Sequence, residues 1–423
     1  MTQRPQRLWH PFADMARVPG TELVLVRGEG AWLEDDRGRR FLDATASLWY
    51  CNVGYGRAEL ADVAAAQMRE LAAYSTFGAY ANRPALELAD RLAGIAPMPD
   101  ATVFLTTGGS DAVDTAAKIA RRYWRLRGEP QRTLLVARSE AYHGMNAYGT
   151  SLAGIRPNAE GWGPLVADVL HVPHDDAAEL ERVLAEHGER VAAFIGEPVI
   201  GAGGVFPPPV GYWERVQRAC AAHGALVIAD EVVTGYGRLG PWFACERFGI
   251  EADLVTTAKG LTSGYFPVGA ILCAPRVRDV LWADAAGPFR HGYTYSGHAA
   301  GCAVALRNLD IIEREGLRDR VRALEPVLAR ALATLERLPL VDETRSVGLL
   351  GAVQLNAEAR AEDPGLADRV VSALQDDGVL VRALVGHSLQ ISPPFVIREQ
   401  ELDLLAERIG SALERVGTVG VAA

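Results

Sequence analysis

Short runs of apolar residues, each bounded by glycine or polar residues, recur along the chain and predict buried β-strands. The clearest is residues 225–229, ALVIA, which follows Gly224 and precedes Asp230 and Glu231. Similar runs lie at residues 101–106, 133–137, 191–196, 254–258 and 268–272. Strands that are apolar along their whole length are typical of a parallel sheet covered on both faces. We therefore expect a buried sheet at the centre of this protein.

Segments with apolar residues three and four positions apart separate these runs, and this spacing predicts helices. The expected helices cover about residues 58–73, 84–95, 112–124, 211–223, 299–315 continuing into 318–336, 365–376 and 398–415. Strands that alternate with helices in this way form right-handed βαβ units. The predicted fold class is therefore α/β, with a large domain built on a mainly parallel sheet that is flanked by helices.

Shorter strand-like pieces near both ends of the chain predict a smaller α+β domain. They are residues 23–26, 31–35 and 40–43 near the N-terminus, and 348–353, 379–382 and 389–392 near the C-terminus. The first three surround glycine-bearing turns and predict a meander. The expected division is an N-terminal arm with part of the small domain (1–50), a large domain (51–310) and a C-terminal small domain (311–423).

The net charge of −10 argues against a nucleic-acid-binding protein, because a phosphate backbone requires a basic surface. No apolar run approaches the roughly 20 residues that span a bilayer, and the first residues lack the apolar core of a signal peptide. We therefore expect a cytoplasmic protein with no membrane segment. The five cysteines lack metal-ligand spacing, so we expect buried thiols, without disulfides or a metal site.

Lysine is rare in this chain. Of the 43 lysines and arginines, only Lys118 and Lys259 are lysine. Lys259 follows the apolar run 254–258, so its amine is a candidate for burial. A buried lysine can lose its proton and attack a carbonyl group, which arginine cannot do. The residues alone leave open that Lys259 is a surface lysine or an ion-pair partner.

A glycine turn joins the run 101–106 to the helix that follows it. Gly108 and Gly109 let the backbone approach an anion closely, and Ser110 adds a hydroxyl at the start of the helix. Free N–H groups and the helix dipole attract phosphate at such a position. The alternative is that Ser110 only caps the helix.

Other candidates follow predicted strands, at the edge where open α/β sheets bind their ligands. Asp230 and Glu197 are acids at strand ends, and Tyr142 stands after the run 133–137 beside His143. Tyr142 is a candidate for stacking on a planar ring, with packing in the core as the alternative. Arg382 is a candidate for binding a carboxylate, with a surface ion pair as the alternative.

Taken together, the order and spacing of these motifs resemble the class III aminotransferases, which belong to the pyridoxal-phosphate enzymes of fold type I. The resemblance covers nearly the whole chain, and its most specific parts are residues 230–240, 257–260, 197–198 and 294–298. Residues 48–57, 113–115 and 261–265 are similar to the ω-amino acid or amine:pyruvate group. The fold implied is a large domain with a mainly parallel, mixed sheet and a smaller α+β domain.

The resemblance implies a role for each matching residue. Lys259 would form a Schiff base with pyridoxal 5'-phosphate and then shuttle a proton, while Asp230 would pair with the protonated pyridine nitrogen. The other implied cofactor-binding residues are Gly109 and Ser110 at the phosphate, Tyr142 and Val232 on the two ring faces, Thr294 from the second subunit, and His143 and Glu197 in support. The implied substrate-binding residues are Trp49, Phe77 and Arg382.

The implied function is transfer of an amino group from an amine or ω-amino acid to pyruvate or another small 2-oxo acid. The implied assembly is a homodimer with the active site at its interface. One alternative is adenosylmethionine-8-amino-7-oxononanoate aminotransferase, through residues 9–11 and 243–246; another is a decarboxylase or racemase on the same fold. Gly78 and the short segment 155–170 depart from the pattern of the amine:pyruvate group and leave the donor open, whereas Gly108 stands where the family often has serine and the backbone binds the phosphate.

Overall fold

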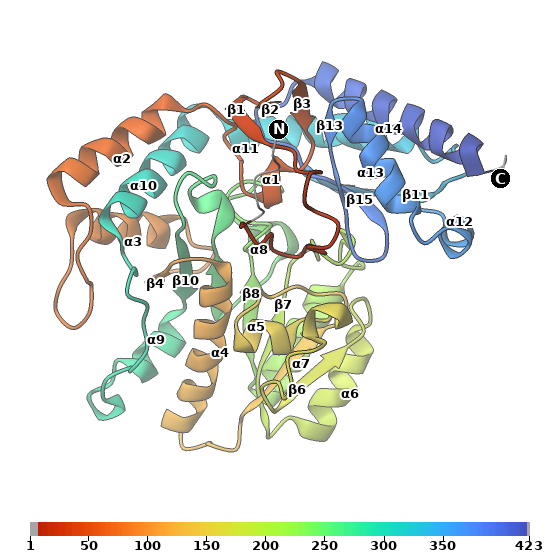
Figure 1. Cartoon of the computed structure of the whole chain (residues 1–423). Coiled ribbons are helices and arrows are strands. Elements are labelled where there is room, and N and C mark those ends of the chain that lie inside the picture. The colour runs from red at the N-terminus through yellow and green to blue at the C-terminus, as the bar shows by residue number, and fades with distance from the viewer. Residues whose placement is uncertain (1–6, 421–423) are drawn as a thin grey trace.

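The computed structural model describes residues 7–420 and is built around a seven-stranded sheet (Figure 1). Its strands, in spatial order, are β4 (Thr102–Thr106), β10 (Gly269–Cys273), β9 (Leu254–Thr257), β8 (Leu226–Asp230), β7 (Val191–Gly196), β5 (Leu134–Arg138) and β6 (Val169–Val172). The strands from β9 to β6 are parallel, and β10 runs antiparallel to both of its neighbours. The predicted mainly parallel sheet is confirmed.

Apolar side chains cover both faces of this sheet. In β8, Leu226 and Ile228 join a cluster that includes the buried side of α4 (Gly109–Leu126). Val227 and Ala229 belong to the cluster on the other face. Because side chains alternate between the two faces of a strand, a strand covered on both sides must be apolar throughout. This explains the uninterrupted run ALVIA.

Helices flank the seven-stranded sheet and the smaller sheets. They are α1 (Ala46–Trp49), α2 (Ala58–Leu71), α3 (Arg83–Ile95), α5 (Ala147–Leu152), α6 (Ala177–His187), α7 (Tyr212–His223), α8 (Ala244–Phe248), α9 (Pro275–Leu281), α10 (Ala299–Arg314), α11 (Leu317–Ala333), α12 (Ala357–Glu362), α13 (Leu366–Asp376) and α14 (Glu399–Gly420). Short 3₁₀ turns are η1 (Arg156–Ala159), η2 (Lys259–Leu261) and η3 (Asp284–Ala286). Within residues 7–420, no helix is long and apolar enough to cross a membrane.

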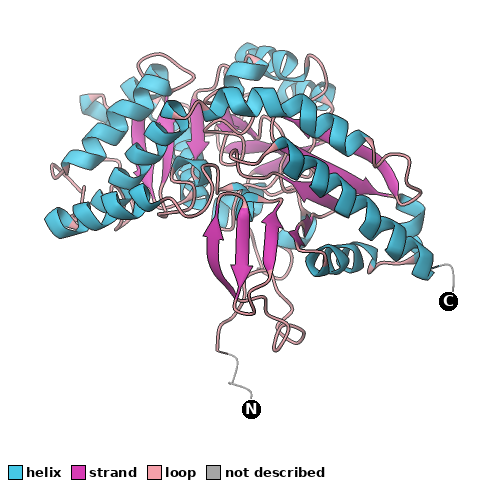
Figure 2. Cartoon of the chain, turned by 90° about the horizontal axis from the view of Figure 1, so that it is seen from above, coloured by secondary structure: helices cyan, strands magenta, loops and turns pink. Residues whose placement is uncertain are grey.

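Two smaller sheets bring together the ends of the chain. The predicted meander consists of β1 (Leu25–Glu29), β2 (Trp32–Asp35) and β3 (Arg40–Asp43), and β13 (Val379–Leu380) pairs with β3 in parallel. The other sheet has the order β11 (Val341–Val347), β12 (Leu350–Leu355), β15 (Ser388–Ile391) and β14 (Arg382–Ala383). In Figure 2 the strands nearest the N-terminus lie at the edge of the molecule, in agreement with the exposed side chains of β1. The proposed domain boundaries stay an interpretation.

The structure corrects three details of the predicted elements. The long helix expected over 299–336 is two helices, because Gly316 adopts a left-handed conformation with φ of 60° between α10 and α11. The strand expected over 379–382 is two short strands in different sheets, β13 and β14. Neither β6 nor α6 was predicted from the pattern. The expectation of buried thiols is confirmed, since all five cysteines are buried and free.

Candidate active site

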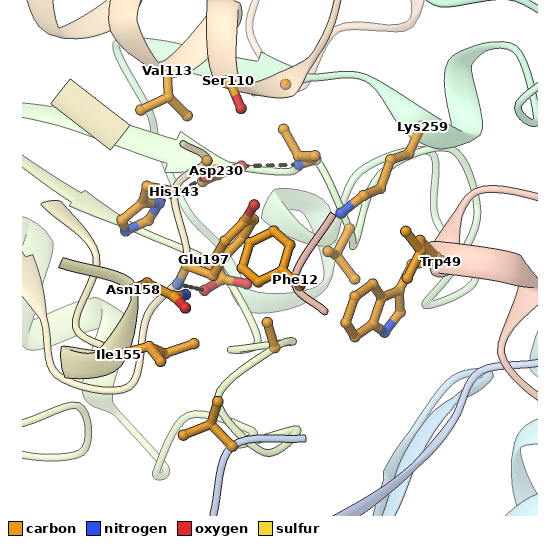
Figure 3. A pocket seen from close by; sticks show the side chains of 18 of the residues that line it. Phe12, Trp49, Ser110, Val113, His143, Ile155, Asn158, Glu197, Asp230 and Lys259 are labelled. Atoms are coloured by element: carbon orange, nitrogen blue, oxygen red, sulfur yellow. Dashed lines mark hydrogen bonds and ion pairs between the residues drawn. The ribbon is translucent and has the colours of Figure 1, made fainter. Parts of the chain in front are cut away.

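A cavity of about 680 Å³ opens at the carboxyl ends of the parallel strands (Figure 3). Glu197 follows β7, Asp230 ends β8 and Lys259 follows β9, and all three side chains line this cavity. Tyr142 and His143, which follow β5, line it too. The strand ends of a parallel sheet meet at one edge, so residues far apart in the sequence converge there.

Asp230 and His143 form a buried pair. The distance between Asp230 Oδ2 and His143 Nδ1 is 2.7 Å, and the Val232 backbone N–H donates to Asp230 Oδ1 at 3.1 Å. Asp230 is 3% exposed and His143 is 1% exposed. His143 Nε2 is also buried, and no residue of the described chain bonds to it. A buried carboxylate held in this way is fixed in orientation and shielded from water.

The Lys259 amine is suited to act as a neutral base or nucleophile. Loss of hydration lowers the pKa of Lys259 to about 8, opposed by Asp230 and Glu197 and assisted by Arg382. A substantial neutral fraction therefore exists close to neutral pH. The backbone of Lys259 has a φ of 44°, an unusual value for a residue with a side chain. Such backbone strain is concentrated at functional sites.

Glu197 is fixed by the loops that surround it. Its Oε1 accepts from the Tyr142 backbone N–H at 3.0 Å, and its Oε2 accepts from the Gly201 N–H at 2.9 Å. The guanidinium of Arg138, which is 1% exposed, donates to the Glu197 carbonyl. Burial raises the pKa of the Glu197 carboxyl above its ordinary value.

The start of α4 forms a cradle that excludes side chains. A Cβ at Gly109 would lie 2.9 Å from Val232 Cγ1, and one at Gly144 would lie 2.5 Å from Ser110 Oγ. Ser110 does not cap the helix: the N-cap is Gly108, and Ser110 Oγ accepts from the Met145 N–H at 3.1 Å. The free N–H groups of an 18-residue helix therefore face the cavity beside a hydroxyl.

Arg382 and Trp49 lie together in the cavity lining. The guanidinium carbon of Arg382 lies 5.3 Å from the centre of a Trp49 ring, and Lys259 Nζ lies 5.1 Å from it. No carboxylate of the described residues pairs with Arg382, and burial lowers the pKa of its guanidinium. The surface ion pair considered for Arg382 is therefore absent within residues 7–420. An arginine that lies in a cavity without a carboxylate partner among the described residues can bind a ligand carboxylate.

Two predicted site residues lie outside the cavity of their own chain. Phe77 is 53% exposed, and Thr294 is exposed as well. The two segments are neighbours, since a Cβ at Gly292 would lie 3.3 Å from the Phe77 ring and Thr76 Oγ1 donates to the Ser296 carbonyl at 3.0 Å. The predicted roles of Phe77 and Thr294 remain predictions.

The cavity also contains residues to which the sequence analysis gave no role. The N-terminal arm brings Pro11 and Phe12 to the cavity, and the segment 155–158 adds Ile155 and Asn158 (Figure 3). Phe12 belongs to the stretch that carries the family resemblance, but nothing in the sequence placed its ring at the cavity. Asn158 stands in η1, and no local pattern marked it. Within the described residues, no group of three or more His, Cys, Asp or Glu is arranged to hold a metal ion.

Comparison with known proteins agrees with this geometry. The family described as Aminotransferase class-III matches residues 15–413. The chain is 37% identical to a β-alanine–pyruvate aminotransferase of Pseudomonas aeruginosa, with 96% of this chain and 95% of that protein covered. It is 37% identical to a putrescine–pyruvate aminotransferase of the same organism, with 97% and 95% covered. The crystal structure of a thermostable (S)-enantioselective ω-transaminase from Thermomicrobium roseum superposes with a TM-score of 0.92, at 39% identity and 96% coverage of both chains.

Proposed function

Because the chain belongs to the class III aminotransferases, we propose that it transfers the amino group of an amine or ω-amino acid to pyruvate or another small 2-oxo acid, with pyridoxal 5'-phosphate as cofactor. The relatives named for β-alanine, putrescine and pyruvate support these substrates. The observation that carries the proposal is the convergence of Lys259, Asp230 and the start of α4 on one cavity.

The residues of the cavity fit this cofactor. Gly109, Ser110 and Gly144 line the cavity at the start of α4, where free N–H groups and the Ser110 hydroxyl would hold a phosphate. Asp230 supplies a buried carboxylate for a protonated ring nitrogen, and Tyr142 and Val232 supply surfaces for the ring faces. When bound, pyridoxal phosphate supplies a carbonyl group and an electron-withdrawing ring.

Each residue then has a distinct task. Lys259, as a neutral amine, would attach the cofactor and then move a proton at the donor carbon. Asp230 would hold the proton at the pyridine nitrogen, and His143 fixes the Asp230 carboxylate by the 2.7 Å contact. Trp49 bounds the space for the donor, and Arg382 binds the carboxylate of the 2-oxo acid.

The apolar lining supports donors with an uncharged body. The apolar side chains of the lining include Leu48, Ile155, Val385, Phe12 and Trp49. Among the described lining residues, one is an arginine, Arg382. A single cationic group binds one carboxylate at a time. The proposal therefore includes amines without a carboxylate as donors, for which the Arg382 guanidinium must lie aside.

The test is a titration of the purified protein, followed by its visible absorption. A simple amine without a carboxylate is added first, and pyruvate is added second. We expect the band of the bound cofactor to disappear with the amine and to return with pyruvate. A protein that stays colourless after addition of pyridoxal phosphate would overturn the cofactor assignment. Loss of the band only with adenosylmethionine as the donor, or release of carbon dioxide, would transfer the function to the alternative enzymes.

The proposal includes a homodimer in which Thr294 and Phe77 serve the partner's cavity. Support comes from their exposure, their mutual proximity and their absence from the cavity lining of their own chain. Sedimentation of the intact protein measures whether it is a homodimer. Cofactor retention on dilution, compared between the protein and Thr294→Val, tests whether the hydroxyl contributes across the interface. We also propose a cytoplasmic location, with no nucleic-acid or membrane partner.

A further inference from the structure

The loop 44–50 follows β3 and contains the short α1, whose backbone is not helical at Ser47 and Leu48. Ala46, Ser47 and Trp49 have φ values of 46°, 57° and 62°. Residues with a Cβ rarely adopt such values, because the side chain approaches the following carbonyl. Three of them within four residues persist only if surrounding contacts hold the loop in place.

One buried carboxylate provides much of that support. Asp43, at the end of β3, is 1% exposed. Its Oδ1 accepts from the Thr45 N–H at 2.8 Å and from the Thr45 hydroxyl at 2.7 Å. Its Oδ2 accepts from the Ser47 N–H at 2.8 Å and from the Tyr55 hydroxyl at 2.6 Å. Asp43 thus binds two backbone N–H groups of the strained loop.

The hydrogen bond from the Tyr55 hydroxyl to Asp43 comes from outside the loop. Burial and the adjacent Asp43 carboxylate raise the pKa of Tyr55 well above its ordinary value, so its hydroxyl remains a donor. No arginine or lysine of the described residues pairs with Asp43. Hydrogen bonds to a charged acceptor are about twice as strong as neutral ones. All four hydrogen bonds to the Asp43 carboxylate therefore come from donors of the loop and from one phenol.

The loop positions two residues that line the cavity. Leu48 and Trp49 are both in its lining, and the Trp49 ring lies 5.1 Å from Lys259 Nζ and 5.3 Å from the Arg382 guanidinium carbon. Trp49 is 4% exposed, and its Nε1 has no hydrogen-bond partner among the described residues. No hydrogen bond of its own indole therefore fixes this ring. Its position depends on the backbone of the loop and on apolar packing, which includes Val199 and Val233.

We propose that Asp43 is a positioning residue for donor selectivity: its carboxylate holds the strained loop 44–50 and so sets where Leu48 and Trp49 bound the substrate space. The inference rests on the proposed function, because it concerns the donor. Asp43 does not line the cavity. It acts through the loop, so its loss changes which amines fit more than it changes the chemistry at Lys259.

The test compares two donors in the amine half-reaction, one small aliphatic amine and one bulky aryl amine. We expect Asp43→Asn to change the ratio of their specificity constants about tenfold or more, because small displacements of lining groups have large kinetic effects. The limiting rate with the small amine, and the rate at which the band returns with pyruvate, should stay within about twofold of those of the original protein. Tyr55→Phe is the matched control. It removes one hydrogen bond to the Asp43 carboxylate but keeps both bonds from the loop N–H groups. The ratio of specificity constants of this variant should stay unchanged.

A rescue separates this role from general loss of structure. In the Asp43→Asn protein, the additional change Ala46→Gly relieves the left-handed position, since glycine adopts φ near 46° without a steric cost. We expect it to restore part of the selectivity. If Asp43→Asn does not fold, Thr45→Val removes one of the four bonds and should shift the ratio in the same direction. If the Asp43→Asn protein folds and its ratio of specificity constants equals that of the original protein, the inference is overturned. Failure of the original protein to use any amine overturns the proposed function instead.

Discussion

His143 and Asp230 face each other across 2.7 Å, and both side chains are almost fully buried. The imidazole leaves one oxygen of Asp230 to the Val232 N–H and directs the carboxylate from the end of β8 into the cavity. A negative charge in this position acts on a ligand with little screening, because the local dielectric constant is low. The geometry makes Asp230 the electrostatic centre of the candidate site.

The first prediction concerns this carboxylate. Asp230→Asn keeps the shape of the side chain but removes its charge, so the pyridine nitrogen would lose the partner that we propose holds its proton. We expect the amine half-reaction to slow by about 100-fold or more, measured by stopped-flow absorbance. Asp253→Asn is the control, since Asp253 is a buried acid just before β9 that pairs with Arg276. Equal rate losses in the two variants would contradict a specific role for Asp230.

The second prediction concerns the need for a lysine. We expect Lys259→Ala and Lys259→Arg to lose at least about a thousandfold of the turnover, because alanine has no amine and arginine is not deprotonated in proteins. Turnover with 2-oxo acid acceptors measures this loss. Lys118→Arg, at the other lysine of the chain, should retain activity. Turnover in Lys259→Arg at the level of the original enzyme would exclude Lys259 as the attachment point.

The third prediction concerns pH. The pKa of Lys259 is lowered from 10.5 to about 8, so its neutral, reactive form accumulates as the pH rises through about 8. In protein freed of cofactor, we expect a small acylating reagent to label Lys259 with a rate that increases through this pH. Peptide mass spectrometry measures the label, with Lys118 as the internal comparison.

A second variant checks the sign of this prediction. Glu197 favours the charged form of Lys259, so Glu197→Gln should move the midpoint of labelling to lower pH. A midpoint that stays near the ordinary value for lysine would show that the amine is not desolvated. A midpoint that rises in Glu197→Gln would contradict the electrostatic assignment.

The fourth prediction concerns the acceptor. Arg382→Leu removes the guanidinium that we propose binds the carboxylate of pyruvate. We expect KM for pyruvate to rise about 10- to 100-fold, in line with the loss of a charged, bidentate hydrogen bond. The half-reaction with an amine lacking a carboxylate should remain within a few fold. Arg382→Lys keeps the charge without the planar fork, so its KM for pyruvate should lie between those of the original protein and Arg382→Leu. An unchanged KM in Arg382→Leu would place the acceptor carboxylate elsewhere.

Much of the candidate site could be predicted from the sequence because its residues lie at strand ends. Residues 225–229 and 254–258 were predicted as buried strands, and the acid and the lysine that follow them converge on one cavity. The reason is physical: parallel neighbours in a sheet bring their carboxyl ends to the same edge. The same reasoning placed Glu197 and Tyr142 correctly beside the cavity.

Other features were not accessible, because they depend on contacts between distant segments. The break between α10 and α11 is a single left-handed glycine within an otherwise continuous helical pattern. Strand β6 is short and only partly buried, so its apolar pattern is weak. Phe12 reaches the cavity from an arm without regular structure, and a hydrophobic pattern carries no information about where such an arm lies.

The sequence by itself determined the alternation of strands and helices, the apolar strands of the central sheet, and the position of Lys259 and Asp230 at strand ends. These depend on local periodicity and on the residue types available at strand ends. Only the tertiary structure decided that His143 fixes Asp230, that Asp43 supports the strained loop of Trp49, and that Phe77 and Thr294 lie outside their own cavity. These relationships join residues through packing and hydrogen bonds in space, and the spacing of residues along the chain does not specify them.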